Sequence, residues 1–145
     1  MIYFDTSFLA PIFQPEDTSR DIENFFNDLP TGSLTTSQWT MLEFSSLIAR
    51  KVRMGLLPDS DAKWVDTQFE LAIRDSFNLL SATTADFDLA KRQVLQFETG
   101  LRAGDALHLA IAKNNRATAI YTLDKAMVKA GEELGLPVSL GIRPH

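Results

Sequence analysis

The chain opens with a short apolar run that ends at an acidic residue, a pattern that indicates a buried strand followed by a turn. The stretch reads Ile2-Tyr3-Phe4-Asp5-Thr6-Ser7. A later stretch repeats the pattern as Ala119-Ile120-Tyr121-Thr122-Leu123-Asp124. Ligands of open parallel sheets bind at the carboxyl ends of strands, so an acid in either place is well positioned for chemistry. Both acids are also typical turn or helix-capping residues, and the two roles are compatible.

Working outward from these stretches, further short apolar runs at 33–36, 77–80 and 137–140 also read as strands. Longer segments with helical periodicity lie between the runs. Strands that alternate with helices favour an α/β fold with a mainly parallel central sheet. A length of 145 residues, without an internal repeat or a low-complexity linker, predicts one domain over residues 1–145.

Capping residues and apolar spacing place most of the helices. We expect helices to begin after Ser37, at Asp59 or Ser60, after Thr83 or Thr84, at 103 and near 125, with Gly55 and Gly135 as stops. The segment 103–114 is apolar on nearly all sides, which is typical of a central buried helix. In the helix after Thr84, the inward side is expected to carry Phe87, Ala90 and Val94, together with Phe97 or Leu95.

Composition excludes several classes of protein. The chain has no cysteine, so disulfides and thiolate zinc sites are absent, and His108 and His145 are too far apart in sequence to form a histidine-rich site alone. A net charge of −5 argues against a protein that coats nucleic acid. No stretch approaches the ~20 apolar residues that cross a bilayer, and Asp5 interrupts any signal-like run. We therefore expect a cytoplasmic protein.

Glu43 and Asp105 are acidic residues in apolar surroundings. Glu43 shares a helical stripe with Trp39 and Leu47 and has no cation three or four residues away, so its carboxylate needs a metal, or a distant Lys or Arg. Asp105 opens the apolar 103–114 helix and follows Gly104, where the chain can approach closely, although a contact with the helix dipole is the simpler explanation. His108 lies one turn later and is expected to be a packed, hydrogen-bonded core residue more often than a ligand.

Four carboxylates in one pocket are hard oxygen ligands suited to Mg²⁺ or Mn²⁺. With Asp5 and Asp124, these residues resemble a PIN domain, and specifically the VapC toxins of bacterial and archaeal toxin–antitoxin pairs. The resemblance covers essentially the whole chain and rests on the order and spacing of residues 2–7, Glu43 within 39–46, and residues 101–110, 121–124 and 134–138.

The resemblance implies a PIN-like three-layer α/β/α sandwich and a Mg²⁺- or Mn²⁺-dependent endoribonuclease. Asp5, Glu43, Asp105 and Asp124 match the family's acidic quartet, with Asp5 and Asp105 as the most direct metal ligands and Glu43 and Asp124 completing the site. Thr6 and Thr122 match supporting hydroxyl positions. Hydrolysis by water would leave a 5′-phosphate and a 3′-hydroxyl, and crowded carboxylates should have raised pKa values without metal.

The resemblance also implies partners: an RNA substrate such as tRNA or ribosomal RNA, a second copy in a homodimer, and an antitoxin that covers the acidic pocket, for example with an arginine. Two alternatives stay open. The chain could be a non-catalytic PIN-like module that binds RNA or protein, or a metal-dependent DNA nuclease or phosphatase. A haloacid-dehalogenase phosphatase fits less well, because Ser7 stands where that family carries a second Asp.

Overall fold

A computed structural model describes residues 1–14, 18–30 and 32–142 of the chain. In these residues, five strands form one parallel sheet: β1 (Ile2–Phe4), β2 (Leu34–Ser37), β3 (Asn78–Leu80), β4 (Ala119–Tyr121) and β5 (Val138–Ser139). Their order across the sheet is β3-β2-β1-β4-β5. The central strand β1 pairs with β2 through Tyr3 and Thr35, and with β4 through Tyr3 and Ile120. The predicted sheet is therefore confirmed, and all of its described pairs are parallel.

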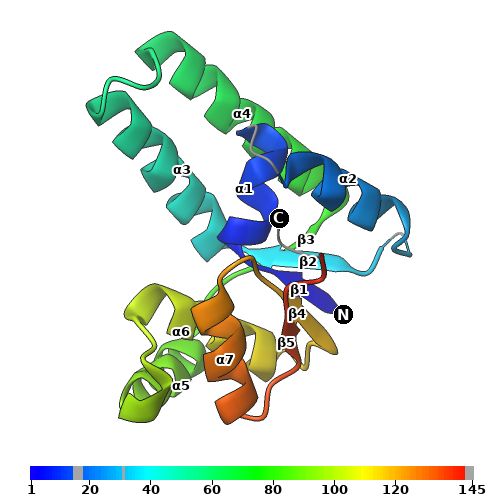
Figure 1. Cartoon of the computed structure of the whole chain (residues 1–145), viewed down its shortest axis with the longest axis vertical. Coiled ribbons are helices and arrows are strands. Elements are labelled where there is room, and N and C mark those ends of the chain that lie inside the picture. Colours follow the sequence, from blue (N-terminus) through cyan, green and yellow to red (C-terminus); the bar gives the residue numbers. More distant parts are fainter. Residues whose placement is uncertain (15–17, 31, 143–145) are drawn as a thin grey trace.

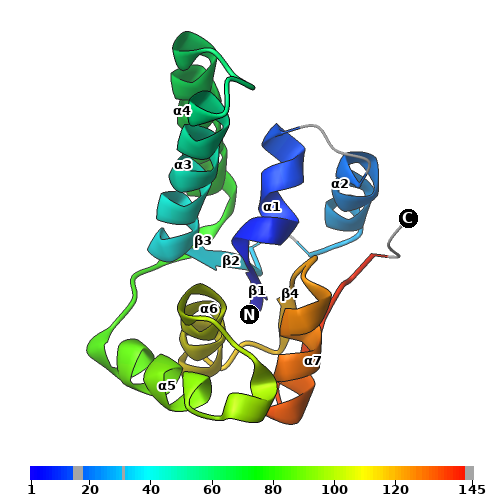
Figure 2. The ribbon, with the colours of Figure 1, turned by 60° about the vertical axis from the view of Figure 1, so that its left-hand side comes forward.

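Four helices cover one face of the sheet: α1 (Thr6–Phe13), α2 (Ser19–Asn27), α3 (Gln38–Arg53) and α4 (Asp59–Ser76). Figures 1 and 2 show α3 and α4 side by side as an arm that extends away from the sheet. The core on this face is rich in aromatic residues, and Phe44 stacks on Phe69 between the two arm helices at a ring distance of 3.8 Å. Phe4 and Phe8 connect this core to the sheet.

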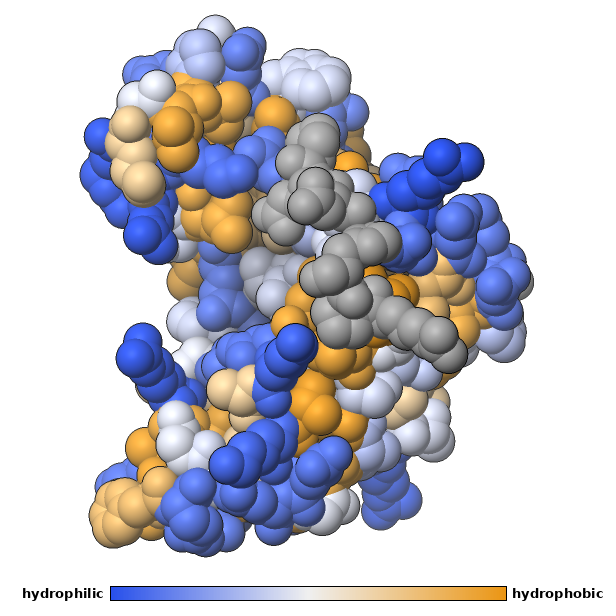
Figure 3. Space-filling model, in the orientation of Figure 1, coloured by the Kyte–Doolittle hydropathy of each residue, from blue (hydrophilic) through white to orange (hydrophobic). Residues whose placement is uncertain are grey.

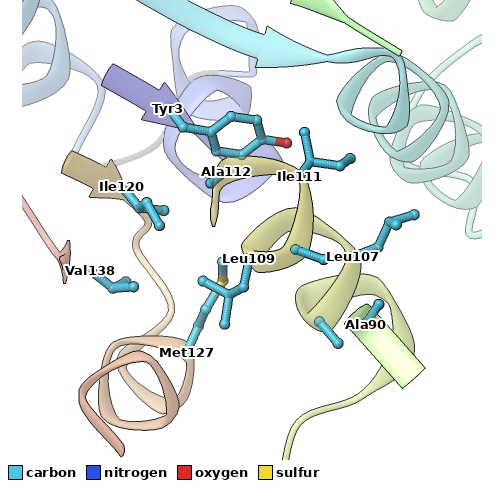
Figure 4. Packing of buried hydrophobic residues seen from close by; sticks show 11 residues of the cluster. Tyr3, Ala90, Leu107, Leu109, Ile111, Ala112, Ile120, Met127 and Val138 are labelled. Atoms are coloured by element: carbon cyan, nitrogen blue, oxygen red, sulfur yellow. The ribbon is translucent and has the colours of Figure 1, made fainter. Parts of the chain in front are cut away.

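The opposite face is covered by α5 (Thr84–Val94), α6 (Ala103–Asn114) and α7 (Lys125–Glu133), with a short 3₁₀ helix, η1 (Phe97–Thr99), after α5. Helix α6 occupies the centre, and its residues 106–112 are all buried. Figure 4 shows how Leu109 and Met127 pack beneath Ile120, while Tyr3 reaches from β1 across α6. The predicted three-layer α/β/α arrangement is thus confirmed, and α6 has the expected bounds.

Two parts of the helical prediction differ from the structure. Helices α1 and α2 have no counterpart among the expected helices. The expectation that Phe87 points inward, with Phe97 or Leu95, is wrong, because these residues are 56%, 80% and 54% exposed. Ala90 is buried as expected, and Gln93 faces the core in their place. His145, the second histidine considered in the sequence, lies outside the described residues. None of the described helices has the length and apolar character needed to span a bilayer.

Candidate active site

Asp5 and Asp124 follow β1 and β4, the two neighbouring strands between which the strand order of the sheet switches direction. From β1 the chain continues to β2 and β3 on one side, and it then returns to β4 and β5 on the other side. Crevices at the carboxyl ends of strands form at such a point and are the usual ligand sites of open α/β sheets. Asp5 directly follows β1, and Asp124 begins α7 shortly after β4. The topology therefore brings both acids to one edge of the sheet.

Asp5 is buried, at 3% exposure, and both of its carboxylate oxygens accept hydrogen bonds. Ser7 Oγ donates to Oδ1 at 2.8 Å, and Thr122 Oγ1 donates to Oδ2 at 2.6 Å. Each hydroxyl in turn accepts a backbone N–H from the β4–α7 loop, from Leu123 to Ser7 at 2.9 Å and from Asp124 to Thr122 at 3.1 Å. The two hydroxyls thus connect Asp5 to the loop that carries Asp124.

Asp124 is the N-cap of α7. Its Oδ1 accepts from the backbone N–H groups of Ala126 at 2.9 Å and Met127 at 3.3 Å. Among the described residues, no donor reaches its Oδ2. Asp5 likewise caps α1 by accepting from the Phe8 N–H at 3.1 Å. The capping role considered for both acids in the sequence is present, and it leaves one oxygen of Asp124 available.

Glu43 extends from α3 toward α6, and one of its oxygens receives two donors. Thr6 Oγ1 donates to Oε1 at 2.7 Å, and His108 Nε2 forms a short hydrogen bond with the same oxygen. The hydrogen-bond partners of Glu43 are therefore a histidine and a threonine, and not the distant Lys or Arg considered from the sequence. His108 is 1% exposed and hydrogen-bonded, so the interpretation of a packed core histidine is confirmed.

The first turn of α6 closes over Glu43 because it contains a glycine. A Cβ atom at Gly104 would lie 3.1 Å from Glu43 Oε2 and 3.6 Å from Trp39 Cζ2. Trp39 Nε1 donates to the Gly104 carbonyl at 3.2 Å, which joins the start of α3 to the start of α6. Gly104 thus permits the close approach of the helix that presents Asp105.

Asp105 lies in the first turn of α6 and is partly buried. In the described part of the chain, no side chain or backbone group donates a hydrogen bond to its carboxylate, and no Lys or Arg forms an ion pair with it. Burial first, and then the charges of Asp124 and Asp5, raise the pKa of Asp105 to about 6. The residue is held in a negative field that the charge of His108 opposes only in part.

The four acids line a single pocket of about 240 Å³ with Thr6, Ser7, Leu47 and His108. Its lining contains no Lys or Arg among the described residues. In the space-filling view the surface is hollowed on the side where α3 faces the lower helices (Figure 3). The structure therefore brings together all four acids that the sequence singled out, with Thr6 in the lining and Thr122 buried behind Asp5.

The pKa values of the acids in the pocket shift in two directions, for different physical reasons. Burial raises the pKa of Asp5, although His108, Thr122 and Ser7 partly oppose that shift. Burial also acts to raise the pKa of Glu43, but the hydrogen bond and charge of His108, together with Thr6, bring it below its ordinary value. The expectation of raised values is confirmed for Asp105 and Asp5 and is wrong for Glu43, because His108 supplies a donor there.

Hard carboxylate oxygens without a nearby Lys or Arg fit a divalent cation by chemistry. In residues 1–14, 18–30 and 32–142, however, no three acidic or histidine side chains are already arranged to hold a metal ion. Each acid except Asp105 is instead engaged by protein donors, and like charges repel one another. Cation binding would therefore require small side-chain adjustments.

Ser7, Tyr3 and Trp39 contribute to the site but were not identified from sequence, whereas the close approach expected at Gly104 is confirmed. Ser7 lies in the quoted opening stretch, and the strand-end position beside Asp5 is the signal that could have found it. Tyr3 and Trp39 act through contacts between segments 34 to 105 residues apart, as in the Tyr3–His108 hydrogen bond. Local patterning carries no such signal.

The profile of the PIN domain family matches residues 2–133. The chain belongs to the PIN domain family. A comparison with curated protein sequences finds no significant match. The family assignment therefore rests on the profile and agrees with the acidic pocket at the edge of the parallel sheet.

Solved structures with the same PIN domain architecture include toxins and toxin–antitoxin complexes. VapC20 from Mycobacterium tuberculosis, described as a sarcin–ricin loop cleaving toxin, has a TM-score of 0.71 at 19% identity, covering 99% of this chain and 100% of that chain. FitAcB from Neisseria gonorrhoeae has a TM-score of 0.76 at 18% identity, with 97% and 98% covered. VapBC-1 from nontypeable Haemophilus influenzae has a TM-score of 0.69 at 14% identity, with 96% and 97% covered. At these identities the likeness establishes a shared fold.

Proposed function

We propose that this PIN domain, folded as one unit over residues 1–145, is a Mg²⁺- or Mn²⁺-dependent endoribonuclease and the toxin of a type II toxin–antitoxin pair in the cytoplasm. The observation that carries the proposal is the pocket in which Asp5, Glu43, Asp105 and Asp124 converge without a Lys or Arg in its described lining. A module that only binds RNA has no need of four carboxylates, which repel phosphate unless a cation intervenes.

Asp105 and Asp5 are proposed as the most direct metal ligands, with Glu43 Oε2 and Asp124 Oδ2 completing the site. A divalent cation, when bound, neutralises phosphate charge and lowers the pKa of water. Ser7 and Thr6 are not proposed as nucleophiles, because both hydroxyls already donate to carboxylates, to Asp5 and Glu43. Thr122 and Ser7 instead hold Asp5 in place, and Thr6 holds Glu43.

The raised pKa of Asp105 favours the same assignment. An acid with a pKa of about 6 and no hydrogen-bond donor is poorly stabilised as an anion by the protein itself. A cation in the pocket would supply the missing stabilisation and release the proton that Asp105 holds at low pH. The pocket is therefore expected to bind divalent cations more weakly below pH 6.

The proposed RNA substrate and antitoxin partner are inferred from the PIN domain family and from the similar solved structures, several of which are toxin–antitoxin complexes. VapC20 cleaves the sarcin–ricin loop by its description, and a structured RNA such as tRNA or ribosomal RNA is our proposed substrate class here. The lining of acids predicts that an antitoxin would present a cation to the pocket, such as an arginine. A homodimer is also proposed.

The test is cleavage of end-labelled tRNA and ribosomal RNA fragments by antitoxin-free protein, with Mg²⁺ or Mn²⁺ and with EDTA. Asp105→Asn removes the proposed ligand without changing size, and Asp88→Asn, on the exposed side of α5, is the matched control. We expect cutting that requires metal, is retained in Asp88→Asn and falls at least about a hundredfold in Asp105→Asn.

Cleavage that survives both EDTA and Asp105→Asn would place the chemistry outside the acidic pocket. Metal-dependent cutting of DNA, or of a small phosphate ester in preference to RNA, would replace the proposed substrate while keeping the site. RNA binding by the metal-loaded protein without cutting of any RNA in the panel would favour a binding module.

A further inference from the structure

A chain of buried hydrogen bonds leads from the sheet to Glu43. Ser37 Oγ lies 2.7 Å from Tyr3 Oη, and Tyr3 Oη lies 2.7 Å from His108 Nδ1. The other ring nitrogen of His108, Nε2, hydrogen-bonds Glu43 Oε1. The chain joins the end of β2, the centre of β1, α6 and α3. It ends at one of the four acids and touches none of the other three by hydrogen bond.

Burial isolates this chain from water. Ser37 and Tyr3 are fully buried, and His108 is 1% exposed. Within the described residues, the His108 ring has one other polar contact, a long one from Nε2 to Thr6 Oγ1 at 3.4 Å. Figure 4 shows the Tyr3 ring crossing α6 with its hydroxyl directed past the apolar side chains of that helix. The ring of His108 is therefore fixed at both nitrogens by protein groups.

Stability alone does not explain these polar groups. Every other buried residue from 106 to 112 of α6 is Ala, Leu or Ile. Apolar residues of similar shape in place of a buried polar network are often neutral or stabilising. A Phe at position 3 and a Leu at position 108 would fill the same core. A buried polar network that lies in apolar surroundings and ends at an acid of the pocket indicates that the network serves the pocket.

The consequence for Glu43 is a carboxylate with two unlike oxygens. Oε1 is occupied by His108 and Thr6, whereas Oε2 has no hydrogen-bond donor in the described residues and lies against Gly104. The Tyr3 hydroxyl suits His108 in either form, because it can donate to a bare Nδ1 or accept from a protonated one. Glu43 thus keeps its donor whether His108 is neutral with its proton on Nε2 or protonated at both nitrogens.

We propose that Tyr3 and His108, anchored by Ser37, are positioning residues that orient Glu43 so that only Oε2 is offered to the pocket. This inference rests on the proposed function of the pocket. Partners of this kind fix metal ligands elsewhere, and their loss typically lowers metal affinity or activity by about 10- to 100-fold. The same loss is expected here, in kcat more than in KM, because Glu43 is displaced and RNA contacts remain.

The test compares Tyr3→Phe with the apolar triple variant Tyr3→Phe/Ser37→Ala/His108→Leu. The triple variant removes Ser37, Tyr3 and His108 together and leaves Glu43 its bond from Thr6. Ser37 gives no side-chain capping bond to α3 that its loss would remove. We expect the triple variant to unfold at or above the wild-type temperature and to bind Mn²⁺ about 10- to 100-fold more weakly by calorimetry. His108→Gln, which keeps a donor, should recover part of the affinity.

A metal-free readout separates this inference from the proposed function. The ¹³C resonance of the Glu43 carboxyl group is expected to shift in Tyr3→Phe, although Tyr3 does not touch Glu43, and the carboxyl resonance of Asp124 should not. An unshifted Glu43 resonance, or wild-type Mn²⁺ affinity in the triple variant, would overturn the positioning role. Wild-type protein that neither binds Mn²⁺ nor cuts RNA would remove the proposed function, while the Glu43 resonance would still decide whether Tyr3 orients that side chain.

Discussion

At the scale of single residues, Gly104 sets how closely α6 approaches Glu43. Its backbone is ordinary helix, so Ala is tolerated by conformation and favoured by helix propensity by up to about 1 kcal/mol. The new Cβ would nevertheless lie 3.1 Å from Glu43 Oε2, which must move by a few tenths of an ångström. Gly104→Ala is expected to match or exceed the wild-type unfolding temperature and to cut RNA about tenfold more slowly.

The measurement is a double-mutant cycle with Glu43→Ala, in which cleavage and unfolding are followed together. If Gly104→Ala acts through Glu43, it should cost little further activity once Glu43 is gone. An undiminished loss in the Glu43→Ala background would show that the methyl group disturbs Asp105 or Trp39 instead.

Asp105 gives a pH dependence of stability whose sign is fixed by its raised pKa. The folded pKa of about 6 exceeds the unfolded value of about 3.9, so the folded protein binds the proton more tightly. Above pH 6 the ionised group destabilises the metal-free fold, and this penalty fades as the pH falls from about 6 to about 4. Asp105→Asn should therefore be more stable than wild type at pH 8, by roughly 1 kcal/mol after allowing for solvent screening, and equal to it at pH 4.

Urea unfolding in EDTA at pH 8, 6 and 4 measures this difference. Added NaCl should shrink it, because part of the penalty is repulsion from Asp124 and Asp5. A gain that persists at pH 4 would have to come from packing and would contradict the electrostatic explanation.

At the scale of elements, Asp124 has two roles that substitution can separate. It caps α7 through Oδ1, and Asn caps a helix about as well as Asp. Asp124→Asn should thus lose most RNA cleavage, at least about tenfold, with little loss of stability, whereas Asp124→Ala should lose cleavage and also about 1 kcal/mol of stability.

Thr83→Ala is the matched capping control, since Thr83 caps α5 by accepting from the Asp86 N–H at 3.2 Å, away from the pocket lining. It should cost similar stability in thermal unfolding and leave cleavage intact. Full cleavage in Asp124→Asn would restrict Asp124 to capping.

Elements also show how far sequence patterns reach. Helix α6 could be predicted because it is apolar on nearly all sides, and the strands because they are short apolar runs between longer segments with helical periodicity. Helix α1 could not, because six of its eight residues are apolar and Pro11 lies inside it, so neither a stripe nor a clear stop is visible. The inward side of α5 was misplaced because an apolar Phe87 outranks Gln93 in any hydrophobic pattern, yet Gln93 is the buried residue.

The same limit applies to the candidate site. The four acids could be predicted because strand ends and apolar helices make an isolated carboxylate conspicuous. The hydrogen bonds that hold them could not: Thr122 and Asp5 are 117 residues apart, and Tyr3 and His108 are 105 apart. Those contacts are set by the order of strands in the sheet.

At the scale of the whole molecule, the outward Phe87, Leu95 and Phe97 form an exposed apolar surface on α5 and η1. An adjoining groove of about 440 Å³ is lined by Trp39, Ala90, Val94 and Leu107 among others. Large apolar surfaces on a protein of this size mark sites of association. This α5–η1 surface is where we expect the proposed homodimer to form, and Trp39 connects the groove to the first turn of α6.

Phe97→Ser tests that expectation with little risk to the fold, because the Phe97 side chain is 80% exposed. Light scattering coupled to gel filtration should give twice the chain mass for wild type and the single-chain mass for Phe97→Ser. The unfolding temperatures of the two proteins are compared at low concentration to check that the variant is folded. Trp64→Ser on α4 is the control, since Trp64 is also a large, exposed aromatic side chain (65% exposed) but lies on the opposite face of the sheet. Dissociation by Trp64→Ser alone would move the interface to the α3–α4 arm, and a monomeric wild type would contradict the homodimer.

The groove beside the α5–η1 surface reaches Trp39, whose indole donates to the Gly104 carbonyl next to Asp105. If this contact couples the groove to the acidic pocket, loss of the dimer should also weaken cleavage.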